Sequence, residues 1–243
     1  MISLEIQIAT DILTTMIERT ITAKPARLSR EAAQHQTRER LLEAAEQLFV
    51  RDGFNGTSLR DIAAHAGYSQ GAFYSNFRDK GEVLLELMGR HKAEETARAT
   101  SMIASLSGTA DDILAALEAW ASSLDETTTW CTLSVELQLQ AARDPAFAVH
   151  YEALWHTQRN GVAEIVRILF EKLGRVPPAS FADVAANFMA LIHGIALQRI
   201  SASATASPAQ TTSAPIMLFL RGLLAQSEPT SSARRDVKRS LKS

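Results

Sequence analysis

Apolar side chains recur at helical spacing through most of this chain. The first clear series runs over residues 37–49 and stops at Asp52-Gly53. Shorter series follow, each preceded by a residue that caps helix N-termini: Ser58, Ser69 and Asp79. The pattern therefore predicts a long helix, two short helices and the start of another long helix.

Beyond residue 80 the series are longer and the breaks are few. They predict helices over residues 81–106, 110–125, 130–142, 146–174, 179–201 and 212–226. No segment alternates apolar and polar residues as a β-strand does, and no motif repeats at a fixed period. The predicted fold class is therefore all-α, without a solenoid.

Composition narrows the class of protein. Of 243 residues, 46% are apolar and 21% are charged, which is typical of a globular protein with a buried core. The single cysteine, Cys131, excludes disulfide frameworks and multi-cysteine zinc sites. No apolar run approaches the roughly 20 residues that cross a bilayer, and the N-terminal segment lacks the features of a secretory signal. We therefore expect a cytoplasmic protein that does not enter a membrane.

The segment from Thr57 to Lys80 predicts a helix-turn-helix. Two short helices are separated by the turn Gly67-Tyr68-Ser69 and follow a longer supporting helix. In such a unit the second helix enters the DNA major groove, with its first residues at the base edges. Here those residues are small or polar, and Gln70 is able to form two hydrogen bonds with a base edge. Phe73 and Phe77 fall on the other side, where we expect them only to pack.

Residues 37–87 carry a dense set of short motifs. They are Ala44-Ala45, Leu48-Phe49, Gly53-Phe54, Thr57-Ser58, Ile62-Ala63, Ala66-Gly67, Ser69-x-Gly71-x-Phe73-Tyr74 and Phe77-x-x-Lys80. With these spacings the segment resembles the DNA-binding domain of the TetR family of bacterial transcriptional regulators. Two positions depart from the commonest pattern: Asn76 stands where His or Tyr is frequent, and Gly81 where Glu is frequent. We expect Gly81 to loosen the start of its helix and to act as a hinge.

The resemblance implies which residues contact DNA. Arg60 on the second helix and residues 70–72 on the third resemble base-reading positions. The phosphate-binding positions are matched by Thr57, Tyr74, Asn76 and Lys80. The predicted DNA-binding set is Thr57, Ser58, Arg60, Ser69, Gln70, Gly71, Ala72, Tyr74, Ser75, Asn76 and Lys80. For Arg60 the alternative is a solvated arginine paired with Asp61.

The rest of the chain resembles the family only in architecture, which implies a helical ligand-binding and dimerisation domain. Larger apolar side chains with a few polar neighbours are typical of a small-molecule pocket. The predicted pocket residues are Trp120, Trp130, Cys131, Glu136, Phe147, Tyr151, Trp155 and His193. The alternative for each is an ordinary place in the core.

Two segments, 181–200 and 214–224, are apolar over more than one helical face. A helix that buries one face in its own domain would leave the other for a second copy of the chain. The predicted dimer interface contains Phe188, Ile192, Ile195, Ile216, Phe219, Leu220 and Leu223. A two-fold dimer would present two reading helices to a near-palindromic operator.

The sequence gives little support for enzymatic activity or for a metal site. Glu152 and His156 lie four residues apart and, with His150 or His193, would supply metal ligands only if they converged. Cys131 lies in an apolar stretch and is interpreted as a small buried hydrophobe. No nucleophile elbow, phosphate-binding loop or dinucleotide motif is present. We therefore expect no catalytic residues, no metal and no cofactor.

The net charge of −2 does not exclude DNA as a partner. Residues 37–80 hold six basic and six acidic residues, whereas residues 81–225 hold ten basic and fifteen acidic residues. The acidity therefore belongs to the second domain, and the position of each charge matters more than the sum.

The sequence predicts four parts. Residues 1–36 form an extension that is disordered in part, residues 37–87 a helix-turn-helix DNA-binding domain, residues 88–226 an effector-binding and dimerisation domain, and residues 227–243 a basic disordered tail. The predicted function is that of a homodimeric repressor released from its operator by a small molecule. The alternatives are a DNA-binding factor without such an effector and an all-α enzyme.

Overall fold

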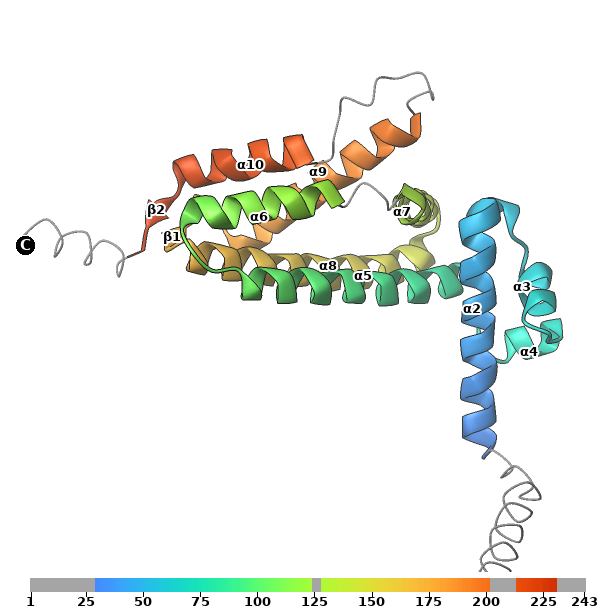
Figure 1. Cartoon of the computed structure of the whole chain (residues 1–243). Coiled ribbons are helices and arrows are strands. Elements are labelled where there is room, and N and C mark those ends of the chain that lie inside the picture. The colour runs from blue at the N-terminus through green and yellow to red at the C-terminus, as the bar shows by residue number, and fades with distance from the viewer. Residues whose placement is uncertain (1–28, 124–127, 202–212, 231–243) are drawn as a thin grey trace, which may run out of the picture. The chain divides into compact units, whose positions relative to one another are not determined.

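The computed structural model describes residues 29–123, 128–201 and 213–230. Over these ranges the chain forms nine helices and one pair of two-residue strands, so the predicted all-α fold is confirmed (Figure 1). The elements are α2 (Arg30–Gly56), α3 (Leu59–His65), α4 (Gln70–Tyr74), α5 (Lys80–Ser105), α6 (Ala110–Ser123), α7 (Thr128–Ala141), α8 (Pro145–Lys172), β1 (Arg175–Val176), α9 (Phe181–Ser201), α10 (Ser213–Gln226) and β2 (Glu228–Pro229).

The chain divides into two compact units, residues 1–39 and 40–243. In the first unit, the hydroxyl of Ser29 accepts a hydrogen bond from the backbone N–H of Ala32 at 3.1 Å, and α2 starts there. The expectation that the helix begins near residue 37 was therefore wrong. Residues 30–36 are exposed and carry no apolar series, which is why periodicity did not reveal them. The rest of the predicted extension, residues 1–28, lies outside the described residues.

The second unit begins with the three-helix head, residues 40–79. The capping predictions are confirmed: Ser58 and Asp61 form a reciprocal capping box on α3, and Ser69 caps α4 by accepting from the N–H of Ala72 at 3.2 Å. Asp79 caps α5 in the same way. Gly67 adopts φ +76° in the turn between α3 and α4, a conformation that favours glycine.

The head is built around buried aromatic rings. The rings of Phe73 and Phe77 lie 5.6 Å apart, and both residues are at most 2% exposed, as expected for packing residues. The same apolar cluster includes Leu133 and Leu137 of α7 and Phe147 of α8. Head and body therefore share one continuous core rather than meeting at a polar linker.

Gly81 lies where α7 and α8 pack against the start of α5. A Cβ atom built at Gly81 would lie 2.8 Å from Nε2 of Gln140 and 2.9 Å from Cε2 of Phe147. The absence of a side chain thus lets α7 and α8 pack directly on the first turn of α5. The expected loosening at Gly81 was wrong, because this junction is tightly packed.

The body is organised on α5 and α8, which run side by side in the same direction (Figure 1). Gly89 packs near Leu154, Gly161 packs on Thr96, and farther along the Nζ of Lys172 donates to the carbonyl of Leu106 at 2.8 Å. Helix α9 packs on α7 and α8, and α10 packs on α6 and α9. A second apolar cluster fills the end away from the head, with Ile103, Ile113, Leu117, Leu169 and Met217 at its centre.

The predicted tail starts later than expected. Glu228 and Pro229 pair antiparallel with Arg175 and Val176, and the guanidinium of Arg175 donates to the hydroxyl of Ser227 at 2.6 Å. Residues 227–230 are therefore part of the fold, which corrects the boundary at 227. Residues 231–243, the basic part of the tail, lie outside the described residues.

Helix α9 is the one described helix that is long and apolar enough, over Phe181–Gln198, to cross a membrane. This window was not predicted from the sequence, because polar residues interrupt it. It also packs against three helices of the body, and 22% of it is buried. Because length and composition alone are weak evidence, we interpret α9 as a body helix with two apolar faces.

Candidate functional site

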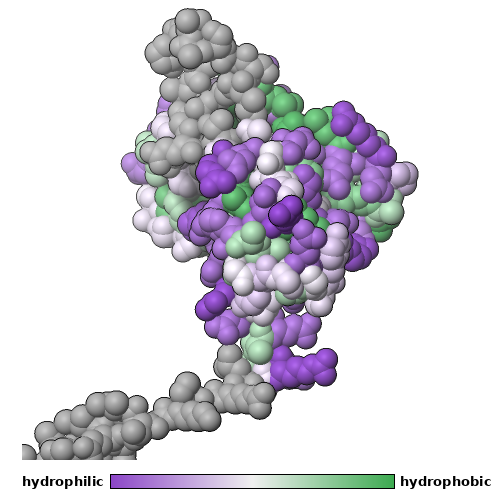
Figure 2. Space-filling model, turned by 90° about the vertical axis from the view of Figure 1, so that its right-hand side faces the viewer, coloured by the Kyte–Doolittle hydropathy of each residue, from purple (hydrophilic) through white to green (hydrophobic). Residues whose placement is uncertain are grey.

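The start of α4 is presented to solvent. Ser69, Gln70 and Gly71 are exposed, and the side chain of Tyr74 is 62% exposed. Phe73 holds the opposite side of this short helix in the core. Figure 2 shows the face that carries α3 and α4, on which hydrophilic residues predominate.

The glycine at position 71 is not required by the fold. A Cβ atom there would make only ordinary contact, 3.6 Å from the hydroxyl of Ser69, and the backbone needs no positive φ. Glycine has a lower helix propensity than alanine, so its presence at this exposed helix start does not stabilise the helix. Its presence is therefore better explained by close approach of a partner than by internal packing.

Other predicted DNA-binding side chains already have partners within the head. The hydroxyl of Ser58 bonds Asp61, and the hydroxyl of Ser75 donates to the carbonyl of Gly71 at 2.9 Å. Hydrogen bonds from Ser58 lower the pKa of Asp61, which keeps its carboxylate charged beside the exposed Arg60. Ala72 is partly buried.

Three of the predicted phosphate-binding residues point inward. Thr57 is 2% exposed, and its hydroxyl donates to the carbonyl of Gly53 at 2.9 Å. The Nδ2 of Asn76 donates to the carbonyl of Ala72 at 2.8 Å. The Nζ of Lys80 donates to the carbonyl of Thr57 at 3.0 Å. Through these hydrogen bonds all three residues stabilise the head.

Phe54 is held from both sides, an arrangement that we call the Phe54 clamp. Its N–H donates to Oε2 of Glu136 on α7 at 3.1 Å, and its carbonyl accepts from Nζ of Lys80 on α5 at 2.7 Å. Its ring lies under Nζ of Lys80, 4.3 Å from the centroid, and against Phe49. Burial lowers the pKa of Lys80, while the charge of Glu136 acts in the opposite direction.

The body contains a cavity of about 520 Å³. All six helices from α5 to α10 contribute to its lining, which is mostly apolar. This volume falls in the range of small-molecule sites, and so does the combination of an apolar wall with a few polar groups.

Three of the predicted pocket residues line this cavity: Trp120, Cys131 and His193. The others are placed elsewhere. Trp130, Phe147 and Tyr151 pack on the cluster of the head, Glu136 belongs to the Phe54 clamp, and Trp155 contacts His156 and Arg159. Most of the lining residues are aliphatic, and aliphatic residues at helical spacing give no local signal that separates a cavity from a core.

All of the predicted dimer-interface residues also line the cavity: Phe188, Ile192, Ile195, Ile216, Phe219, Leu220 and Leu223. The opposite faces of the same two helices are exposed or open. Leu197 is 44% exposed and Leu218 is 75% exposed, and a Cβ atom at Gly194 or Gly222 would meet nothing within 4 Å.

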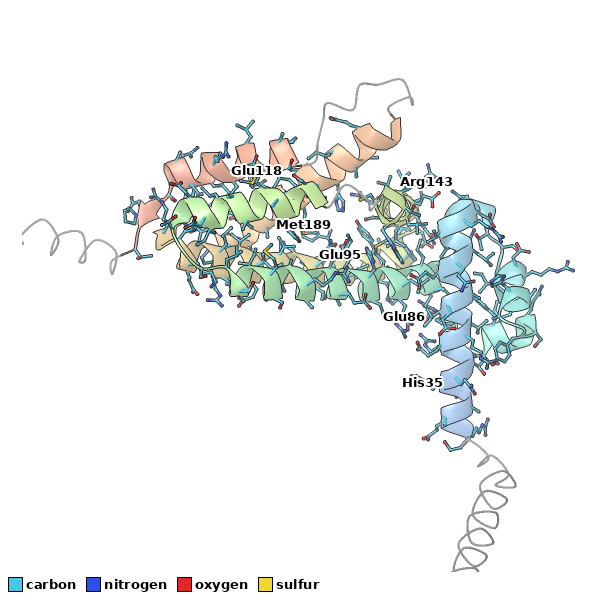
Figure 3. The ribbon with its side chains drawn as sticks, in the orientation of Figure 1. His35, Glu86, Glu95, Glu118, Arg143 and Met189 are labelled. Carbon is cyan, nitrogen blue, oxygen red and sulfur yellow. The ribbon has the colours of Figure 1, made fainter. Side chains whose placement is uncertain are left out.

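A charged cluster stands in the cavity wall on α5. Nζ of Lys92 lies 2.7 Å from Oε2 of Glu95, and Nε2 of His91 lies 3.1 Å from Oε1 of the same carboxylate. Burial alone would raise the pKa of Glu95, but His91 and Lys92 outweigh it and bring the pKa to about 2. Burial, followed by the charge of Lys92, lowers the pKa of His193. Figure 3 labels Glu95 on α5 and Met189 on α9, which both belong to this lining.

Helix α7 joins the cavity to the head. Cys131 and Ser134 line the cavity, whereas Leu133 and Leu137 lie in the cluster of the head. Glu136, between them, reaches Phe54. A movement of α7 at the cavity would therefore displace residues that pack on the head.

Within the described residues, no group of three His, Cys, Asp or Glu side chains could hold a metal ion. Glu152 and His156 form an exposed pair at 3.5 Å, and Nε2 of His150 lies 3.3 Å from Arg78. His193 lines the cavity on another helix.

Two family models match the chain. The model described as "Bacterial regulatory proteins, tetR family" matches residues 41–87, and the model described as "BetI-type transcriptional repressor, C-terminal" matches residues 109–240. The second match spans more than half of the chain.

Curated relatives match mainly in the head. The repressor BepR of Brucella suis is 44% identical over 64 residues, which cover 26% of this chain and 30% of BepR. The repressor AcnR of Corynebacterium glutamicum is 27% identical over 132 residues, which cover 54% of this chain and 63% of AcnR. The chain thus spans less than two thirds of either relative.

Solved structures match in fold. A TetR-family regulator of Mesorhizobium loti has a TM-score of 0.62 at 16% identity, covering 82% of this chain and 99% of that chain. FadR of Thermus thermophilus in complex with lauroyl-CoA has a TM-score of 0.56 at 23% identity, covering 77% and 93%. A regulator of Saccharomonospora viridis in complex with choline has a TM-score of 0.56 at 18% identity, covering 79% and 96%.

We predict that Lys80→Met lowers the free energy of unfolding by about 1–3 kcal/mol, because it leaves two backbone carbonyls without their donor. Urea unfolding followed by circular dichroism measures the change. The matched control is Arg60→Met, which removes an exposed cation and should change stability by less than about 0.5 kcal/mol. Equal effects of the two substitutions would show that Lys80 does not support the head.

Proposed function

We propose that this chain, which belongs to the TetR family of bacterial transcriptional regulators, is a homodimeric repressor that releases its operator when a small molecule fills the body cavity. The observation that carries the proposal is the exposed polar start of α4, fixed to its scaffold by the buried Phe73. The match of the head to the TetR model and of the C-terminal part to the BetI-type repressor model supports this proposal.

In the proposed complex, α4 lies in the major groove. Gln70 reads a base edge, Gly71 allows close approach of the backbone, and Tyr74 reaches a phosphate. Arg60 on α3 supplies the cationic contact, because the ammonium of Lys80 is held inside the head. Thr57, Asn76 and Lys80 act by shaping the head rather than by touching DNA.

The proposed dimer is formed by the outward faces of α9 and α10. These neighbouring helices expose Leu197 and Leu218, and Gly194 and Gly222 leave room for a second helix to approach. Two helices from each subunit would form a four-helix bundle about a two-fold axis. The two α4 helices would then bind the two half-sites of a palindromic operator.

The proposed effector acts through α7. A molecule in the cavity touches Cys131 and Ser134, and the same helix holds Phe54 through Glu136. Its effect on DNA affinity equals its difference in affinity between the two head arrangements, about 1–3 kcal/mol in typical cases. Lauroyl-CoA bound to FadR and choline bound to the Saccharomonospora viridis regulator support such a role for the body.

This function accounts for the remaining expectations. The named relatives are transcriptional regulators rather than enzymes. A regulator that binds DNA and a small molecule acts in the cytoplasm, where both are present. The cavity favours an effector-controlled regulator over a DNA-binding factor without an effector.

We predict that Gln70→Ala weakens operator binding by about 1–3 kcal/mol, because it removes a base contact. The operator is first recovered by selection from random DNA with the wild-type protein, and affinity is then measured by fluorescence anisotropy. Gln138→Ala, an exposed glutamine on α7, is the control and should bind as the wild type does. If Gln70→Ala also binds as the wild type does, α4 does not read DNA in this way.

We predict that Leu218→Glu converts the dimer to single chains of 26.5 kDa, because it places a carboxylate in the proposed apolar interface. Light scattering after gel filtration measures the mass. Val149→Glu, on a 65% exposed valine of α8, should leave the dimer intact. A dimer that survives Leu218→Glu would place the interface elsewhere.

A further inference from the structure

The polar groups of the cavity gather at one end. Gly161 packs on Thr96, which sets Gln158 on α8 about level with Lys92 on α5. His193 lies close enough for the charge of Lys92 to lower its pKa. Ser134 belongs to the same end, because Trp130, one turn before it on α7, stacks on His91 at 4.1 Å.

The other end is apolar. Ile103, Leu117, Leu169 and Met217 line the cavity and also form the second apolar cluster of the body. The rise from Lys92 to Ile103 along α5 is about 16 Å at roughly 1.5 Å per residue. The cavity therefore has room for an extended chain with one polar end.

The charged residues of the lining determine which headgroup charge the cavity favours. Glu95 is the only acidic residue among the described residues of the lining, and its carboxylate is already shared by Lys92 and His91. The side chain of Lys92 is 16% exposed, and its ammonium carries three donors, of which Glu95 takes one. A cationic headgroup beside Glu95 would also meet the ammonium of Lys92, whereas an anionic headgroup can accept hydrogen bonds from the remaining donors of that ammonium.

We propose that the cavity binds an amphipathic anion, such as a medium-chain carboxylate, with its headgroup on Lys92 and His193 and its chain along Ile103 and Leu169. This proposal deepens the proposed function, on which it rests, by naming the class of effector. His193 serves as a neutral hydrogen-bond donor to the headgroup, and Ser134 and Gln158 complete the polar end. The aliphatic walls bury the chain at a gain of about 0.8 kcal/mol for each CH₂ group.

The test compares three probes with the same ten-carbon chain: decanoate, 1-decanol and decyltrimethylammonium. Isothermal titration calorimetry with the full-length dimer measures each affinity. We expect decanoate to bind at least about tenfold more tightly than decyltrimethylammonium, with decanol between them. Preference for decyltrimethylammonium, or no binding by any of the three, would overturn the proposal.

A double variant tests the headgroup contact. Lys92→Met alone would leave a partly buried, charged Glu95 without this partner, so Lys92→Met is combined with Glu95→Gln to remove both charges. Decanoate should then bind about tenfold more weakly, with decanol changed by less than about twofold. The control is Arg90→Met, which removes an exposed cation of the same helix that pairs with Glu86 and lies outside the cavity lining, and it should bind decanoate as the wild type does. Unchanged decanoate affinity in the double variant would overturn the role of Lys92.

The variant Gln70→Ala separates this proposal from the proposed function. It should lose operator affinity and still bind decanoate as the wild type does. Decanoate binding without release of operator DNA would contradict the proposed function and leave the ligand class standing. Release of the operator by decyltrimethylammonium instead would contradict the ligand class and leave the function standing.

Discussion

The structure depends on the way in which one residue, Phe54, is held between two helices. Its N–H is bonded to Glu136 on α7, its carbonyl to Lys80 on α5, and its ring lies under the ammonium of Lys80. Each helix that carries one of these partners also lines the cavity. The position of the head is therefore set by the two helices that a bound molecule would touch.

The packing around the Phe54 clamp explains how a small displacement of α7 would be transmitted to the head. Leu133 and Leu137 of α7 lie in the same core as the head, and Gly81 brings α7 and α8 onto the first turn of α5. Densely packed cores change between discrete arrangements rather than deforming continuously. A shift of α7 at Ser134 would thus be transmitted to Phe54 through closely packed side chains.

The sequence predicted the head in detail because its signals are local. The caps Ser58, Ser69 and Asp79 and the apolar spacing around Phe73 each act within one or two turns of a helix. The body was harder to predict. Helices α9 and α10 are apolar over more than one face, so periodicity could not tell that Phe188 and Phe219 face the cavity while Leu218 faces outward. The role of Glu136 depends on a contact 82 residues away in the chain, which no local pattern encodes.

The most direct test of this account is the hydrogen exchange rate of the Phe54 amide in the full-length protein, with and without the substitution Glu136→Ala. If α7 holds the head through Phe54, this amide should exchange about tenfold faster in the variant. Gln138→Ala, on the exposed side of the same helix, should leave the rate unchanged. Equal exchange rates in Glu136→Ala and the wild type would contradict the claim that the body controls the head at this point.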